Sequence, residues 1–245
     1  MRVALAFLLA ALVLLVSCGG EDESAGGAAS PSGDEGSGNP ADSTTPVDAT
    51  ATPAADQETV AAIENLDFPS ELIDGNAIGD PDAPLHLVVY EDFQCPHCLA
   101  FTAEVEPVLL DEFVREGDLL LEVRHFPVMG NASAGAAVAA ECARQEDAFW
   151  EYHRQLFLQQ ATGGPFTGEA FEAIASDLGL DEAAFAECLR SDATIQTVSD
   201  EAQEARTAGI TGTPGFILDG ETLAPAPADA AGWRTLLQER LSAGE

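Results

Sequence analysis

The sequence predicts an α/β fold in which a strand, a helix and a second parallel strand form the centre. Three observations carry this prediction. An apolar, β-branched run at residues 85–90 leads directly into Cys-Pro-His-Cys, after which apolar residues recur at helical spacing as far as Phe113. A second strand-like run covers residues 119–126, and residues 131–208 carry an almost entirely helical pattern. A strand–helix–strand order of this kind is typical of a βαβ unit.

The bulk composition limits the class of protein. The chain has 245 residues, of which 43 are Asp or Glu and 9 are basic, giving a formal net charge of −34. This length allows one to two domains and a sizeable core. All the basic residues are arginines, and nucleic-acid binding is excluded because contacts to phosphate need cationic clusters.

The N-terminal segment predicts export. Met1 and Arg2 precede a wholly apolar run at residues 3–16, which is too short for a stable membrane anchor. It ends in Leu-Val-Ser-Cys-Gly, which resembles a bacterial lipobox with Cys18 as the lipidated residue. We therefore expect a signal peptide at 1–17 and a lipid anchor on the extracytoplasmic side of a bacterial cell membrane. An ordinary secretory signal with an incidental cysteine is the alternative, and in both cases disulfides persist.

Residues 18–57 are rich in Gly, Ser, Ala, Pro, Thr and acids, so we expect a disordered acidic linker that gives an anchored domain its reach. A leader segment at 58–84 then predicts a short helix, followed by a small strand and turn near Asp74-Gly75.

The Cys-Pro-His-Cys motif predicts a redox dithiol. Pro96 suits a first helical turn, so Cys95 opens the helix and its sulfur faces unpaired N–H groups. These groups, and His97 if it is cationic, lower the pKa of Cys95 and favour an attacking thiolate. Cys98 lies one turn further in, placed to close a disulfide with Cys95. A zinc half-site is the alternative, but a structural site needs a second ligand pair and the other cysteines are isolated, so no metal is predicted.

Three stretches together resemble the DsbA-like thioredoxin-fold thiol–disulfide oxidoreductases. They are the Gly-Asn-x-x-x-Gly-Asp-Pro-x-Ala-Pro-like leader at 75–84, Asp-Phe-Gln-Cys-Pro-His-Cys at 92–98, and Gly-Ile-Thr-Gly-Thr-Pro-Gly-Phe at 209–216. The resemblance implies a thioredoxin fold in two parts, 85–130 and 209–245, separated by a helical insertion at 131–208. It also implies that Pro214 is cis, lies against the dithiol and leaves the backbone of Thr213 open to a substrate strand.

Two further cysteines, Cys142 and Cys188, sit in different predicted helices of the insertion. An exported location favours a structural disulfide between them, which in the chain-entropy model contributes roughly 4 kcal/mol. Two buried free thiols and a second redox pair are the alternatives. Related sequences often place a histidine or arginine at the end of the second strand, here His125, for which a structural role is favoured over a catalytic one. The chain closes with a hairpin at 216–223 and a helix at 228–241.

These features predict an exported enzyme that introduces disulfides into reduced or unfolded exported proteins, without a cofactor. A stabilised Cys95 thiolate favours the reduced dithiol and makes the disulfide oxidising. Reoxidation then requires a membrane partner, which we expect to be a quinone-linked reoxidase. A reductase or isomerase of the same fold is the main alternative, and a lipoprotein binding module with a structural Cys-x-x-Cys is another.

One residue departs from the family pattern. Thioredoxin-like proteins often bury an acid six residues before the first cysteine, but here that position is Val89. Glu91 has the same strand parity and could substitute as the proton shuttle. The alternative is that Glu91 is solvated or caps the helix.

Overall fold

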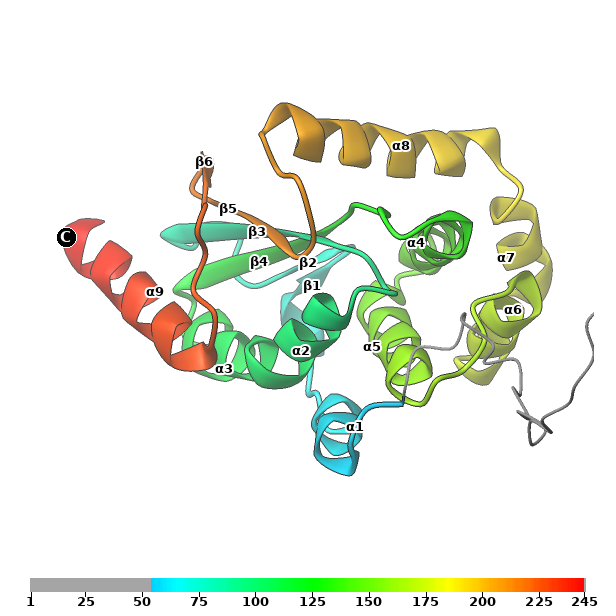
Figure 1. Ribbon diagram of the computed structural model, residues 1–245, viewed down its shortest axis with the longest axis horizontal. Helices are drawn as coiled ribbons and strands as arrows, with labels where there is room; N and C mark the ends of the chain where they lie inside the picture. The colour runs from blue at the N-terminus through cyan, green and yellow to red at the C-terminus, as the bar shows by residue number, and fades with distance from the viewer. Residues whose placement is uncertain (1–53, 245) are drawn as a thin grey trace, which may run out of the picture. The chain divides into compact units, whose positions relative to one another are not determined.

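The computed structural model describes residues 54–244, so the predicted signal peptide, Cys18 and nearly all of the linker lie outside the described residues. The described chain contains a six-stranded sheet with the order β1-β2-β4-β3-β5-β6 (Figure 1). Among residues 54–244, no helix combines the length and apolarity needed to cross a membrane.

The two central strands are β3 (Leu85–Glu91) and β4 (Leu119–His125). They pair in parallel, with Glu91 opposite His125, as the βαβ pattern predicts. A small antiparallel hairpin of β1 (Ile73–Asp74) and β2 (Ala77–Ile78) extends the sheet beyond β4. On the other side, β5 (Gly215–Leu218) pairs antiparallel with β3, and β6 (Glu221–Thr222) forms the edge.

Asp219 and Gly220 form the turn of the predicted hairpin at 216–223, between β5 and β6. Asp219 and Gly220 both have positive φ, at 51° and 80°. Consecutive left-handed residues are the requirement of a type I′ turn, whose twist matches that of the flanking strands.

The connection from β3 to β4 differs from the sequence prediction. Apolar spacing predicts one helix from Cys95 to Phe113, but the structure has α2 (Pro96–Glu104), α3 (Glu106–Leu109) and a π-helical turn η2 (Leu110–Val114). The break falls at Val105 because Pro107, in the first turn of α3, has no N–H to donate to the carbonyl four residues earlier, so the hydrogen-bond ladder of α2 cannot continue into α3. Glu106, the first residue of α3, is buried and only 1% exposed.

Five helices lie between β4 and β5 and form the predicted insertion: α4 (Asn131–Arg144), α5 (Phe149–Ala161), α6 (Gly168–Asp177), α7 (Glu182–Cys188) and α8 (Asp192–Thr207). Thr167 and Asp181 are the N-caps of α6 and α7, and their side chains accept backbone N–H groups from the first turn. Outside the insertion, α1 (Gln57–Glu64) and the 3-10 turn η1 (Ser70–Leu72) precede the sheet, and α9 (Ala230–Gly244) follows it.

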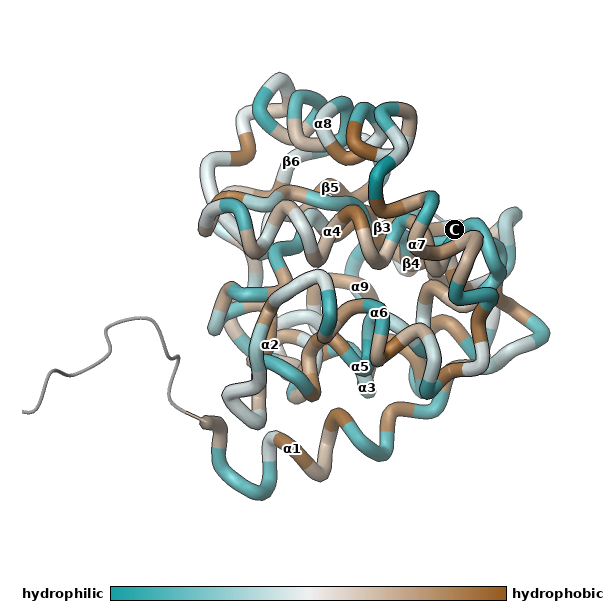
Figure 2. The backbone as a smooth tube through the Cα atoms, turned by 90° about the vertical axis from the view of Figure 1, so that its right-hand side faces the viewer, coloured by the Kyte–Doolittle hydropathy of each residue, from teal (hydrophilic) through white to brown (hydrophobic). Residues whose placement is uncertain are grey.

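The sheet separates two cores of unequal size. Val88 and Tyr90 of β3 pack with Ala202 and Ala205 of α8 in the smaller core. The alternate residues of β3 face the large core, which also contains Trp233 of α9 and the aromatic residues of α5. In Figures 1 and 2, α8 lies on one side of the strands, while α1, α2 and α3 lie on the other. Glu91, at the end of β3, faces the large core.

Candidate active site

Cys95 occupies the N-cap position of α2, as the sequence predicts, with Pro96 in the first turn. Its backbone is extended, at φ −77° and ψ 120°, and its carbonyl accepts the Leu99 N–H at 3.1 Å. Cys95 is 5% exposed and Cys98 is fully buried, and both are free thiols, so the structure represents the reduced dithiol.

The proline loop lies against the dithiol. The Thr213–Pro214 peptide is cis, and the Cys95 Sγ donates to the Thr213 carbonyl oxygen at 3.2 Å. These residues are 118 positions apart in the chain, and the pairing of β5 with β3 brings them together. The arrangement is the one that the family resemblance implies for Thr213 and Pro214.

The surroundings of the two sulfur atoms push their pKa values in opposite directions. The Cys98 thiol, the Thr213 side chain and the backbone amides of Cys98 and His97 all stabilise the Cys95 thiolate, lowering the pKa of Cys95 to about 5 against an opposing effect of burial. Burial, the hydrogen bond to Cys95 and the nearby Glu91 raise the pKa of Cys98 well above its ordinary value. Cys95 is therefore the more nucleophilic of the two sulfurs, whereas Cys98 holds its proton.

The two residues between the cysteines are both exposed. The sequence suggests that a cationic His97 helps Cys95. In the structure, the stabilising group from this residue is its backbone N–H.

Glu91 is buried, which excludes a solvated role, and α2 has no side-chain cap hydrogen bond, which excludes a capping role. Glu91 is 1% exposed, and its Oε2 lies 2.9 Å from Nε2 of His153 on α5. Burial and the nearby Cys95 sulfur raise the pKa of Glu91 well above the usual range of a carboxyl. Val89, at the position where relatives often have the acid, is an ordinary core residue.

Sequence reasoning did not identify His153 or Asp92. His153 appears in the sequence as a single histidine in an aromatic helix, with no motif around it. Asp92 is 1% exposed and accepts three backbone N–H groups, from Gln94 at 2.9 Å, Val128 at 2.7 Å and Met129 at 2.9 Å. It thereby fastens the segment after β4 to the residues that lead into Cys95. The Asp directly after a strand was the available signal for such a loop-binding role.

His125 lies beside Glu91 in the sheet and is 2% exposed. Burial, with His153 and Arg144 nearby, lowers the pKa of His125 to about 3, so it is neutral. It is packed against Phe93 and Phe149, consistent with the structural role favoured for it.

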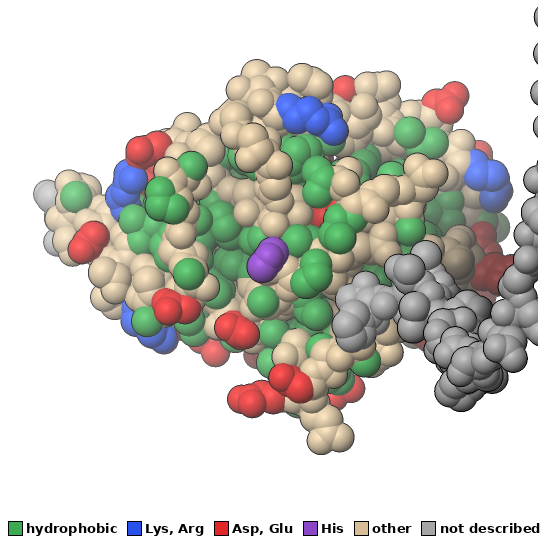
Figure 3. All heavy atoms as spheres, in the orientation of Figure 1, with side chains coloured by type: hydrophobic (Ala, Val, Ile, Leu, Met, Phe, Trp, Pro, Cys, Tyr) green, Lys and Arg blue, Asp and Glu red, His purple; other side chains and the backbone are tan. Residues whose placement is uncertain are grey.

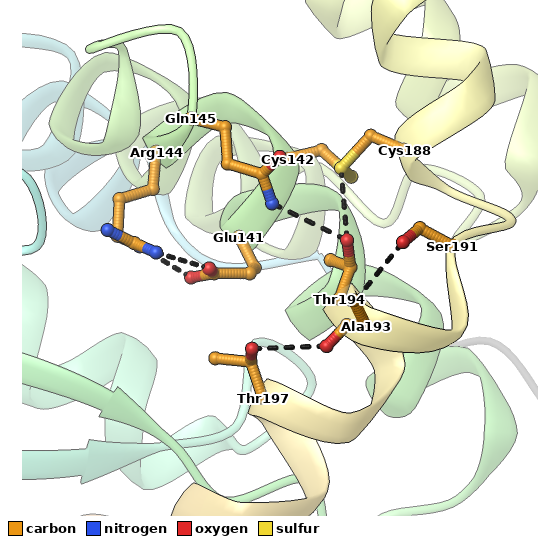
Figure 4. The surroundings of a disulfide bond; sticks show 9 residues. All are labelled: Glu141, Cys142, Arg144, Gln145, Cys188, Ser191, Ala193, Thr194 and Thr197. Carbon is orange, nitrogen blue, oxygen red and sulfur yellow. Dashed lines mark hydrogen bonds and ion pairs between the residues drawn. A yellow bond between two sulfur atoms is a disulfide. The ribbon is translucent and has the colours of Figure 1, made fainter.

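Cys142 of α4 and Cys188 of α7 are joined in a disulfide, with their Cα atoms 5.7 Å apart (Figure 4). Thr194, on the first turn of α8, contacts both Cys188 and Gln145, the C-cap residue of α4. Its hydroxyl oxygen lies 3.4 Å from the Cys188 sulfur and accepts from the Gln145 side chain at 3.4 Å. The disulfide joins α4 to α7, and the hydrogen bonds of Thr194 join α8 to both, in a part of the chain well separated from the dithiol.

The profile of the thioredoxin family, described as thioredoxin, matches residues 71–239. The chain belongs to this family. Oxidised BdbD from Bacillus subtilis is similar in structure, with a TM-score of 0.63 and 23% identity over 69% of this chain and 93% of BdbD. Wolbachia pipientis α-DsbA1 has a TM-score of 0.60 and 19% identity, covering 75% of this chain and 99% of that one. The predicted DsbA-like thioredoxin fold is confirmed.

Sequence relatives cover smaller parts of the chain. Disulfide bond formation protein D of Bacillus subtilis is 33% identical over 85 residues, 34% of this chain and 38% of that protein. The Na(+)/H(+) antiporter NhaA 1 of Mycobacterium sp. strain KMS is 36% identical over 148 residues, 58% of this chain. The chain spans only 23% of that antiporter's length.

Proposed function

We propose that this protein is an exported thiol–disulfide oxidase that introduces disulfides into reduced or unfolded proteins through Cys95 and Cys98. The observation that carries the proposal is the contact of the Cys95 sulfur with Thr213 at 3.2 Å, at the start of α2 and beside the cis proline. The pKa of Cys95 at about 5 supports it, because a stabilised thiolate favours the reduced state and makes the disulfide oxidising. The similarity to disulfide bond formation protein D points the same way.

The reaction begins from the oxidised protein. A substrate thiolate attacks the Cys95 sulfur, forming a mixed disulfide while the Cys95–Cys98 bond breaks and its electron pair passes to Cys98. Because the pKa of Cys98 is raised, this sulfur takes up a proton. A second substrate thiolate then attacks the first substrate sulfur, forming the substrate disulfide and releasing Cys95 as a thiolate. Two electrons have moved from the substrate to the dithiol.

Glu91 is the proton donor to Cys98 in this scheme, and its acceptor during reoxidation. Its buried carboxyl has a raised pKa and is therefore protonated when Cys98 leaves as a thiolate. Glu91 would thus fulfil the role that relatives often give to an acid two residues earlier.

A substrate segment would bind beside the cis proline. The backbone N–H of Thr213 has no hydrogen-bond acceptor among residues 54–244, so it is available to a client backbone. Hydrophobic side chains gather in the middle of the face shown in Figure 3, over the beginning of α2. Val128 and Met129, which follow β4, are 46% and 53% exposed and would contact apolar client side chains.

The location and partners belong to the same proposal. The apolar run before Cys18 supports export and lipid anchoring on the outer side of a bacterial membrane. Reoxidation would fall to a quinone-linked membrane protein that accepts two electrons from the dithiol.

Two measurements test the proposal. The reduction potential of the Cys95–Cys98 pair, equilibrated against glutathione, should lie in the oxidising range of DsbA rather than near thioredoxin. Cys95→Ser should abolish disulfide formation in a reduced, unfolded substrate. A thioredoxin-like potential would instead indicate a reductase, and full activity in Cys95→Ser would refute a redox role.

A further inference from the structure

A cluster of three buried titratable groups lies near the dithiol. Glu91 comes from β3, His153 from α5 and Glu106 from α3, and none is more than 1% exposed. Glu91 and His153 are joined at 2.9 Å through Oε2 and Nε2. The three residues come from separate stretches of chain, so their meeting is a product of the fold.

The surroundings of the cluster are unusually apolar for such groups. The His153 ring packs against Phe93, Phe149, Trp150 and Phe157, with centroids 4.9 to 5.9 Å away. Within residues 54–244, Glu91 Oε1, Glu106 Oε1 and His153 Nδ1 have no hydrogen-bond partner. Each buried polar atom left unpaired destabilises a fold, so a group of them in one core is evidence for a functional requirement.

The protonation states of the cluster follow from this burial. Burial lowers the pKa of His153, so the imidazole is neutral and carries one N–H. Burial raises the pKa of Glu106 to about 7, although the nearby His153 opposes this effect. The charge of the Cys95 sulfur raises the pKa of Glu91, and the charge of Glu91 raises the pKa of Cys98. The cluster is therefore coupled electrostatically to both sulfurs.

Other charged groups around α5 are accounted for. His125 on β4 is neutral, and Glu141 of α4 is paired with Arg144. The carboxylates of α1, α2 and α6, which also pack against α5, are exposed to solvent, and so is His97 of α2. Glu91 is therefore the one group among the described residues that hydrogen-bonds the His153 ring.

We propose that His153 is a positioning residue that fixes Glu91 for proton exchange with Cys98. The Nε2–H donates to Glu91 Oε2 in both protonation states of the carboxyl, which leaves Oε1, free of protein partners, to carry the proton. When the disulfide opens, the Glu91 Oε1–H bond breaks, its proton passes to the Cys98 sulfur, and the resulting carboxylate keeps the hydrogen bond from His153. During reoxidation the same carboxylate takes the proton back. This inference rests on the proposed oxidase function and assigns to the helical insertion a part in it.

The test compares pH profiles of single variants. Reduction of the Cys95–Cys98 disulfide by a small dithiol is followed over a range of pH. Because proton donation to Cys98 requires the neutral Glu91, the wild-type rate should fall on the alkaline side as this group ionises. Glu91→Gln should remove that limb of the profile.

His153→Phe removes the donor to the carboxylate, and the limb should move to higher pH by about one to two units. His153→Gln offers an amide donor and should restore the limb toward its wild-type position. Tyr152→Phe is the matched control, since it is equally buried on the same helix and loses one hydrogen bond, to the Phe171 carbonyl. It should leave the limb in place.

The outcomes separate the two proposals. An unmoved limb in His153→Phe, together with its loss in Glu91→Gln, overturns the role of His153 and keeps that of Glu91. A wild-type profile in Glu91→Gln removes the proton-donor role of Glu91 and this inference with it, while inactivity of the wild-type protein itself refutes the oxidase function. If His153→Phe does not fold, nitrogen NMR of the wild-type histidine rings decides, because a His153 ring with Nε2 unprotonated contradicts the proposal.

Discussion

The Cys98 thiol is the leading cause of the low pKa of Cys95, and its removal gives a sharp test of the site. Substitution Cys98→Ala deletes this donor and leaves the start of α2 and its amides in place. We expect the pKa of Cys95 to rise from about 5, with Cys98→Ser staying close to the wild type because a hydroxyl can donate in the same position.

The size of the effect follows from the chemistry of the donor. A hydrogen bond to a charged group contributes about 1.5–3 kcal/mol, and a thiol is a weak donor, so the lower end applies. This corresponds to an increase of about one pKa unit. At pH 5 the thiolate fraction of Cys95 would then fall from about one half to about one tenth.

The same shift has a consequence for stability. The folded pKa of Cys95 is depressed from its ordinary 9.0 to about 5, so the stabilisation of the reduced protein is complete above pH 9 and is lost as the pH falls through 5. At pH 7 it is about 3 kcal/mol, from two units at 1.36 kcal/mol each.

The assay is a titration of thiolate absorbance in the ultraviolet for the reduced wild type, Cys98→Ala and Cys98→Ser. A titration is preferable to an alkylation rate, because intrinsic nucleophilicity rises with pKa and masks part of the change. A midpoint in Cys98→Ala equal to that of the wild type would show that the helix amides and Thr213 hold the thiolate without Cys98. A wild-type midpoint near 9 would contradict the whole electrostatic description of the site.

Substitutions at Cys142, Asp92 and Gly79 probe the framework around the site. Cys142→Ser opens a loop with a sequence separation of 46 and should lower the free energy of unfolding by roughly 4 kcal/mol under non-reducing conditions, and urea denaturation that matches the wild type would contradict this. Asp92→Ala leaves three backbone N–H groups without their acceptor and should cost roughly 2–3 kcal/mol in the same assay, with Asp92→Asn intermediate. Gly79→Ala, at φ +132°, drives a methyl group into the Leu119 carbonyl and should lower the melting temperature more than Gly117→Ala, at φ +80° with open space around it. Equal effects of the two alanines would show that backbone strain alone decides.

The parts of the fold that local sequence determines were predictable. The β-branched run of β3, the proline after Cys95 and the Asp-Gly turn each restrict the backbone within a few residues, and the structure agrees with all three. The meeting of Cys95 with Thr213 was implied only by the family motif, because no local pattern links positions 118 residues apart.

The buried cluster of Glu91, Glu106 and His153 could not be predicted from local sequence. His153 is a lone histidine on a helix whose aromatic spacing indicates a core, and that spacing says nothing about which polar group it meets. Glu106 is buried at the start of α3, just after a helix break that the apolar periodicity does not indicate. Sequence alone left open whether Glu91 was buried or solvated, and packing of α5 across the end of β3 decided it.

The parts of the chain that supply this cluster matter for engineering chimeras of the protein. Its two acids, Glu91 and Glu106, belong to the thioredoxin part of the chain. The His153 imidazole and most of the aromatic rings around it belong to α5. A chimera that exchanged residues 131–208 for those of a relative would replace α5, and with it the His153 ring that contacts Glu91. Unless the new segment placed a hydrogen-bond donor at position 153, such a chimera would keep the Cys-Pro-His-Cys motif and Glu91 but lose the hydrogen bond that holds the Glu91 carboxyl.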